Sequence, residues 1–142
     1  MANDTFERAK KYVYELVGYN ERVPFYVLTR DSCSEISRLV GYRLRKEFPR
    51  AKICICKGKV RGHSHDVLLV EENQVYVIDP TVWQFSRYKK SILVAKADST
   101  DGAIATLMRH YGGKWRVSEH IHNYSAVEIK RLKCVIRDNI AY

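Results

Sequence analysis

The sequence predicts an α+β fold in which helices near both ends of the chain flank a run of antiparallel strands. Apolar residues recur at helical spacing in the first third and at the end, whereas residues 52–60 alternate as a strand does. The central strands follow one another with only short turns between them, which is typical of an α+β arrangement. With 142 residues, 46% of them apolar, the chain is long enough to form a core, so we expect one domain over residues 1–142.

Two helices are expected before the strands. Residues 4–18 show an amphipathic helical pattern that Gly18 ends, and residues 23–29 form a short apolar stretch after it. The second helix covers about residues 33–48, because apolar side chains recur along one stripe until Pro49 stops the helix.

The remaining elements follow in a regular order. We expect strands over 52–60, 67–70, 75–78 and 91–97, a helix over 101–111, a strand over 115–120 and a helix over 125–140. The final helix has Ser125 as its N-cap and Glu128 at the capping-box position, so its start is well defined.

The net charge of +9 is unevenly distributed. Residues 1–64 carry 14 Lys and Arg against 7 Asp and Glu, whereas residues 65–142 carry 11 against 9. A basic half of this kind could attract nucleic acid, anionic lipid or an acidic protein partner, or it could serve solubility alone. The charges are dispersed along helices and no nucleic-acid motif is present, so we do not expect a nucleic-acid-binding protein.

No targeting or membrane segment is evident. The longest apolar runs are far shorter than the roughly 20 residues of a membrane span. The N-terminal residues lack the apolar core and cleavage site of a signal peptide. We therefore expect a cytoplasmic protein, with export by a route that needs no such signal as the alternative.

The four cysteines are too few for a disulfide scaffold in a chain of this length, so free thiols are expected. A zinc site is the alternative, since Cys54-x-Cys56 and His63-x-His65 could supply four ligands from neighbouring strands. Structural zinc sites usually take their cysteines from a knuckle with a wider spacing, and cysteine is a common buried residue. We therefore expect no metal.

Cys33 is the first candidate for chemistry. Asp31 or Ser32 would cap the second helix, with Glu35 completing a capping box, which places Cys33 in the first helical turn. The positive end of a helix dipole favours the thiolate, which is the nucleophilic form of cysteine. The amide of Cys33 would also be free to bind a developing oxyanion, because first-turn amides lack helical acceptors.

His65 and Asp79 are candidates for the base and its orienting carboxylate. His65 opens one predicted strand, Asp79 ends the next, and Pro80 terminates the ladder. A hairpin centred on Glu72-Asn73 would bring residues 65 and 79 roughly opposite each other, as a general base and the group that fixes its tautomer require. His63 is the rival base, because it shares strand parity with His65.

Two segments resemble a known superfamily. Residues 31–40 (DSCSEISRLV), followed by a Leu-Arg pair at 44–45, are similar to the nucleophile helix of transglutaminase-like proteins. Residues 77–81 (VIDPT), 14 residues after His65, are similar to the Asp-Pro-Thr element of the same families. Residues 65–70 also resemble the His strand of papain-like peptidases and of bacterial papain-fold glutamine deamidases and toxins.

The resemblance implies that Cys33 is the nucleophile, His65 the base and Asp79 the orienting acid. It implies a papain/transglutaminase-like fold in which the Cys-bearing helix packs on an antiparallel sheet. The sequence departs from the pattern at Val67, where many members have an aromatic residue, and at Val27, where papain-type enzymes have a glutamine that supplies an oxyanion donor. The second donor could be Asn20, Thr29 or Gln84, and Trp83-Gln84-Phe85 could line a substrate pocket or pack in the core.

The expected function is cysteine-dependent acyl transfer at an amide or thioester carbonyl of a protein or peptide substrate. Water as acceptor gives a peptidase, amidase or glutamine deamidase, and an amine acceptor gives a transferase. In the absence of a prodomain or secretion signal, we favour a side-chain amidase or deamidase over a general protease. Such chemistry needs no cofactor. The alternatives are a catalytically inactive binding domain of this fold and a basic nucleic-acid-binding protein.

Overall fold

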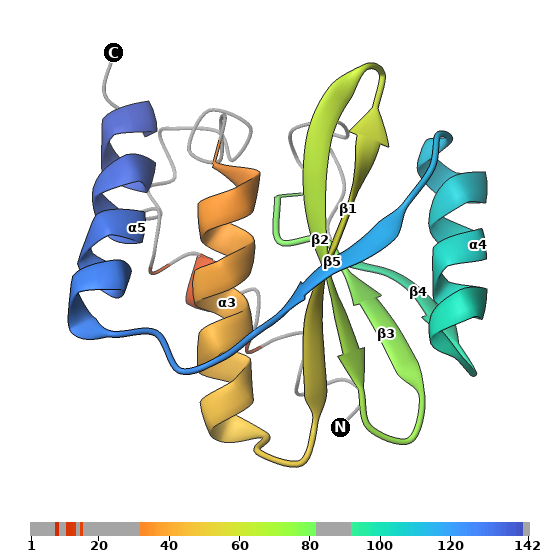
Figure 1. Ribbon diagram of the computed structural model, residues 1–142, viewed down its shortest axis with the longest axis horizontal. Coiled ribbons are helices and arrows are strands. Elements are labelled where there is room, and N and C mark those ends of the chain that lie inside the picture. The colour runs from red at the N-terminus through yellow and green to blue at the C-terminus, as the bar shows by residue number, and fades with distance from the viewer. Residues whose placement is uncertain (1–7, 9–10, 14, 16–31, 82–91, 141–142) are drawn as a thin grey trace.

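The computed structural model describes residues 8, 11–13, 15, 32–81 and 92–140 (Figure 1). Its elements are α3 (Cys33–Glu47), β1 (Lys52–Val60), β2 (His63–Glu71), β3 (Val75–Ile78), β4 (Leu93–Ala97), α4 (Thr100–Tyr111), β5 (Arg116–His120) and α5 (Ala126–Ile140). The α+β class is confirmed, and the element bounds agree with the sequence pattern except that β2 begins at His63, four residues before the predicted start.

The strands form one antiparallel sheet in the order β4-β3-β2-β1-β5. The first four strands follow the chain, because each is close in sequence to the next. The fifth strand instead crosses to the far edge after α4 and pairs with β1 (Figure 1). This return brings the segment around Trp115 next to the β1–β2 hairpin, which matters for the candidate site.

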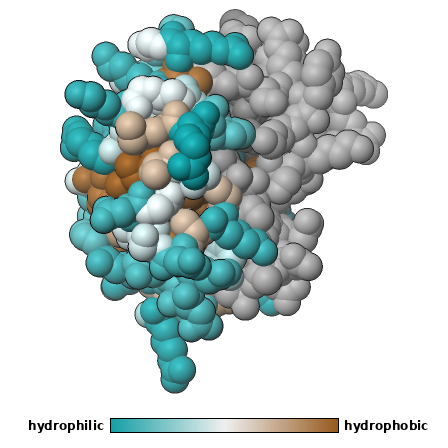
Figure 2. Space-filling view, turned by 90° about the vertical axis from the view of Figure 1, so that its right-hand side faces the viewer, coloured by the Kyte–Doolittle hydropathy of each residue, from teal (hydrophilic) through white to brown (hydrophobic). Residues whose placement is uncertain are grey.

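Helices cover both faces of the sheet: α3 and α5 lie on one side and α4 on the other (Figure 1). Along β2, Leu68 and Val70 belong to the core under α3 and α5, whereas Val67 and Leu69 belong to the core under α4. Both faces of β2 are therefore buried, which explains its uninterrupted apolar run. On the α4 side, hydrophilic residues form most of the top and bottom of the visible surface (Figure 2).

The two predicted capping boxes have different outcomes. At α5, the Ser125 amide donates to Glu128 and the Glu128 amide donates to the Ser125 hydroxyl, both at 3.1 Å, so that prediction is confirmed. At α3, Ser32 is the N-cap but its side chain makes no capping hydrogen bond. Its hydroxyl instead accepts a hydrogen bond from Asn139 of α5, at 3.0 Å, so the capping box with Glu35 is wrong.

The first predicted helix is described only at residues 8, 11–13 and 15, all of which are helical, with Val13 fully buried. The apolar stretch at 23–29 and the proposed cap Asp31 lie outside the described residues. Within the described part of the chain, no helix is long and apolar enough to cross a membrane.

Candidate active site

The β2–β3 hairpin places His65 and Asp79 on the same face of the sheet. Leu68 pairs with Ile78, so the register is shifted by two residues from one that would set His65 directly opposite Asp79. Because a two-residue shift preserves the side to which each side chain points, the two residues become diagonal neighbours. Asp79 is the first residue after β3, and its amide donates to the carbonyl of Ile92 at 2.8 Å, which fixes the backbone there.

His65 and Asp79 form a buried hydrogen-bonded pair. His65 Nε2 lies 2.8 Å from Asp79 Oδ2, and both side chains are fully buried. The His65 ring makes edge-to-face contacts with Tyr111 and Trp115, whose ring centroids lie 5.9 and 6.3 Å away. Since Nε2 is hydrogen-bonded to the carboxylate, Nδ1 is the nitrogen that would exchange a proton with a reacting group.

Asp79 is held in place by further donors. Its Oδ2 also accepts a hydrogen bond from the Tyr111 hydroxyl at 2.5 Å, and its Oδ1 accepts from the amide of Thr81 at 3.1 Å. Burial and the neighbouring Asp79 charge raise the pKa of Tyr111, so that phenol stays protonated and keeps donating. These contacts restrict the carboxylate to one orientation, which in turn orients the imidazole.

Cys33 is the first residue of α3 and is half-buried. Its sulfur lies 4.0 Å from the carbonyl oxygen of Ser64, the residue before His65. Burial of the imidazole by itself lowers the pKa of His65, but the Asp79 carboxylate, followed by hydrogen bonding and charge from Cys33, outweighs burial and raises the pKa to about 10. The three predicted residues are therefore brought together, and the contacts of His65 with Asp79 and Cys33 favour its protonated form.

The start of α3 is fastened to β2 beside the site. The hydroxyl of Ser37 donates to the carbonyl of Asp66 at 3.3 Å, and Arg38 Nη1 donates to the Asp66 carboxylate at 3.0 Å. Lys57 lies 3.3 Å from the other oxygen of that carboxylate, and Arg38 also pairs with Glu119 of β5. These contacts set the distance between the helix that carries Cys33 and the strand that carries His65.

Trp115 packs on the sheet where a glycine leaves room for it. Gly58 pairs with His65 across β1 and β2, and a Cβ added at Gly58 would lie 2.3 Å from the Trp115 ring. Trp115 Nε1 donates to the carbonyl of Gly112 at 2.9 Å, which holds the ring in this position. The sequence analysis missed both Trp115 and Tyr111. The strand order that brings Trp115 to this position has no local signal in the sequence.

Other predicted residues are placed away from this group or lie outside the described residues. His63 is exposed near the end of the β1–β2 hairpin. Asn20, Thr29 and Gln84, the candidates for a second oxyanion donor, lie outside the described residues, as do Trp83 and Phe85.

The four ligands of the alternative zinc site are not gathered. In the β1–β2 register Cys54 and Cys56 pair with Leu69 and Val67, so Cys56 is a diagonal neighbour of His65, but Cys54 and His63 lie farther along the hairpin in opposite directions. Within residues 32–81 and 92–140, no three His, Cys, Asp or Glu side chains are arranged to hold a metal ion. Cys54 has a different neighbour, because its sulfur lies 3.0 Å from His120 Nδ1 on β5, and the sequence analysis did not predict this pair.

Comparison with known proteins adds no family assignment. No protein-family model, curated protein or solved structure matches the chain.

Proposed function

We propose that this protein is a cysteine-dependent acyl-transfer enzyme with a papain/transglutaminase-like fold, most simply a hydrolase of amide or thioester bonds. In this proposal Cys33 is the nucleophile, His65 transfers protons and Asp79 orients the imidazole. The order Cys, His, Asp along the chain and the helix-on-sheet arrangement around them support the assignment.

One observation carries the proposal. A fully buried imidazole donates to a buried carboxylate through Nε2 and interacts with a half-buried cysteine at a helix N-terminus. A buried ion pair of this kind stabilises a fold poorly compared with apolar residues of similar volume, so its presence beside a thiol favours a chemical role.

The first step follows from the raised pKa of His65. A protonated imidazole next to Cys33 stabilises the thiolate, which attacks the carbonyl carbon and forms the carbon–sulfur bond. The negative charge moves to the carbonyl oxygen, where the first-turn amide of Cys33 can donate a hydrogen bond. His65 Nδ1 then gives its proton to the leaving nitrogen or sulfur, and that group departs to leave a thioester on Cys33.

The second step restores the enzyme. Neutral His65 takes a proton from the acceptor, and the acceptor oxygen or nitrogen attacks the thioester carbonyl. The carbon–sulfur bond breaks and the electron pair returns to the sulfur, so that the thiolate and the protonated imidazole are regenerated. Water as acceptor gives a carboxylic acid, and an amine gives a new amide.

The test uses an activated acyl donor that makes few demands on specificity. Incubation with p-nitrophenyl acetate should acetylate Cys33 and then release acetate, which intact-mass analysis and p-nitrophenol absorbance follow together. Cys134 is the matched internal control, because it is also half-buried but lies on α5 away from any described His–Asp pair. Acetylation of Cys33 no faster than that of Cys134 would overturn the proposal. A His65→Gln variant should lose turnover of the acetyl group.

A further inference from the structure

A hollow of about 680 Å³ lies beside the candidate active site. It is formed by the β1–β2 hairpin and by the segment that leads into β5, with Gly58, Ser64 and Trp115 among its lining residues. Ser64 contributes the carbonyl that contacts the Cys33 sulfur, and Trp115 contacts the ring of His65. A molecule bound in this hollow would therefore lie against residues that contact Cys33 and His65.

The charged side chains that line the hollow are all basic: Lys57, Lys59, Lys114 and Arg116. Lys57 is partly neutralised, because it pairs with the buried carboxylate of Asp66. For the other three, no ion pair with an acidic residue is present in the part of the chain that the structure describes. We call the hollow and these three cations the basic groove. Uncompensated charges around a concave surface focus a positive potential into it and attract anionic ligands.

The chemistry of the neighbouring candidate site favours a peptide as the anionic ligand of the basic groove. Trp115 packs against Gly58 and is only 6% exposed, so the three cations, rather than the ring, dominate the surface that a bound molecule meets. A polynucleotide could also meet cations and an aromatic ring here, but its backbone has no carbonyl for a cysteine nucleophile, whereas a peptide does.

We propose that the basic groove binds an acidic segment of a protein substrate, with Asp or Glu residues flanking the amide that Cys33 attacks. This inference rests on the proposed function, which places the attacked amide at Cys33. It adds the substrate class of that site, an acidic protein segment. Lys59, Lys114 and Arg116 provide the charge selection.

The test measures peptide binding without catalysis. The full chain carrying Cys33→Ser is titrated against short fluorescent peptides in which one glutamine is flanked by glutamates, serines or lysines, and anisotropy gives each affinity. The glutamate peptide should bind at least about tenfold more tightly than the serine peptide, and the lysine peptide should bind most weakly. Equal affinity for the glutamate and lysine peptides would overturn the inference.

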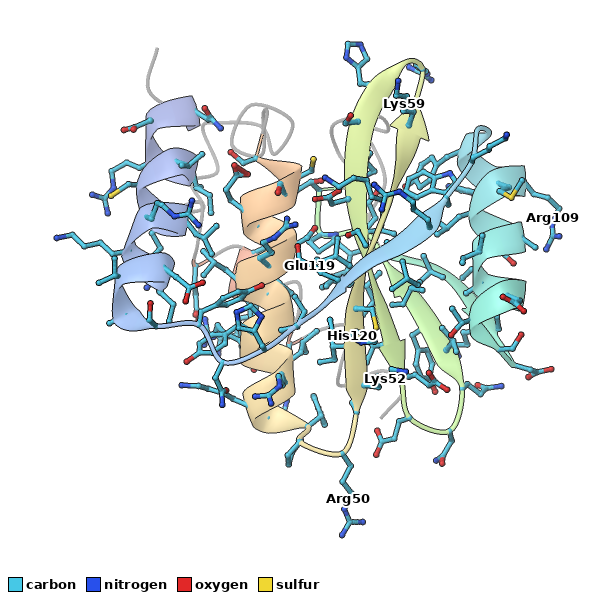
Figure 3. The ribbon with its side chains drawn as sticks, in the orientation of Figure 1. Arg50, Lys52, Lys59, Arg109, Glu119 and His120 are labelled. Atoms are coloured by element: carbon cyan, nitrogen blue, oxygen red, sulfur yellow. The ribbon has the colours of Figure 1, made fainter. Side chains whose placement is uncertain are left out.

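Charge reversal locates the binding surface. The double variant Lys59→Glu/Lys114→Glu should weaken binding of the glutamate peptide by at least about tenfold. The control Arg50→Glu/Lys133→Glu changes the net charge equally but lies elsewhere, since Arg50 is at the opposite end of the molecule from Lys59 (Figure 3). The control should bind as the parent does. Equal losses in both double variants would overturn the assignment to this groove.

Two further measurements separate the possible failures. Single-stranded oligothymidylate that binds more tightly than the glutamate peptide and displaces it would overturn the inference in favour of nucleic acid. In the wild type, bound glutamate peptide should slow iodoacetamide labelling of Cys33 and leave Cys134 unaffected. Peptide binding with this protection, combined with no acetylation of Cys33, would reject the proposed function while the groove assignment stands.

Discussion

Two cysteine–histidine pairs involve strands of the same sheet, and their surroundings differ. Cys33 is at a helix N-terminus beside a buried His65 that Asp79 holds at 2.8 Å. Cys54 is near the start of β1, with its sulfur 3.0 Å from His120, an exposed residue on β5 that Figure 3 labels. Proximity of a thiol to an imidazole is thus common to both pairs.

The two pairs differ in the surroundings of the thiol and in the hydrogen-bond partner of the imidazole. Cys54 pairs with Leu69 on one side and His120 on the other, so the sheet ladder surrounds it and no helix N-terminus points at its sulfur. Burial raises the pKa of the Cys54 thiol, which keeps it protonated. No carboxylate is hydrogen-bonded to His120 within the described part of the chain. Of these two pairs, the Cys33 pair combines a helix N-terminus with a buried carboxylate, the surroundings expected of an activated thiolate, and the Cys54 pair has neither in the described part of the chain.

The largest effect on stability is expected at Asp79. Asp79→Ala leaves the buried donors of His65, Tyr111 and Thr81 without their acceptor, so the free energy of unfolding should fall by about 3–5 kcal/mol. Asp98→Ala, at an exposed carboxylate, should change it by less than about 0.5 kcal/mol. Urea unfolding measures both, and similar losses would show that the buried pair is not the stronger interaction.

The pH dependence of stability tests the same pair. The pKa of His65 rises from its ordinary 6.5 to about 10 in the folded state. Below pH 6.5 both states hold the proton and the stabilisation is complete; between 6.5 and 10 only the folded state holds it, so the stabilisation falls and is lost above the folded pKa. The difference in the free energy of unfolding between the wild type and His65→Gln should therefore shrink as the pH rises from 6.5 to 10.

Other groups also titrate in this pH range, such as Cys56, whose pKa burial raises to about 11. Subtracting the plot of unfolding free energy against pH for His65→Gln from that of the wild type removes their contribution. Guanidinium unfolding at a series of pH values supplies both curves. A constant difference between the wild type and His65→Gln from neutral to alkaline pH would contradict a protonated His65.

Packing beside His65 gives a smaller expected effect on stability. Gly58→Ala would force Trp115 away from the sheet, because its ring atoms lie 2.3–2.6 Å from the added Cβ, and we expect a loss of about 1–3 kcal/mol. Gly102→Ala is the matched control, because its nearest contact is the Ser99 hydroxyl at 3.3 Å and alanine favours helix. Thermal unfolding distinguishes them, and equal changes would show that Trp115 is not held against Gly58.

The smallest effect is expected at the second pair. His120 is exposed, so His120→Gln should change the free energy of unfolding by less than about 1 kcal/mol and leave the reactivity of Cys33 unaltered. Iodoacetamide labelling resolved by peptide mass analysis measures the second quantity. A large fall in Cys33 labelling would mean that the two pairs are coupled through the sheet.

The features that could be predicted from the sequence are those that depend on residues close together in the chain. The bounds of α3, β1, β3 and α5 follow from side-chain periodicity and from stop signals that act within a few residues. His65 and Asp79 were paired correctly on one face even though the register was two residues off, because strand alternation depends only on parity.

Contacts between distant segments account for the rest. The capping box at Ser32 failed because Asn139, 107 residues later, takes the serine hydroxyl. Tyr111 reaches Asp79 from the end of α4, and the Cys54–His120 pair depends on β5 joining the sheet beside β1. Neither arrangement leaves a periodic trace in the sequence, so both had to come from the three-dimensional structure.

The most direct measurement is the pH dependence of alkylation of the four thiols in one sample. Limiting iodoacetamide is added to the native wild type and to His65→Gln, and the labelled peptides are quantified at each pH. In the wild type, Cys33 should react at least about tenfold faster than Cys134 near pH 6, and His65→Gln should abolish this advantage. A Cys33 that follows the same pH curve as Cys134, with or without His65, would contradict an activated thiolate at this site.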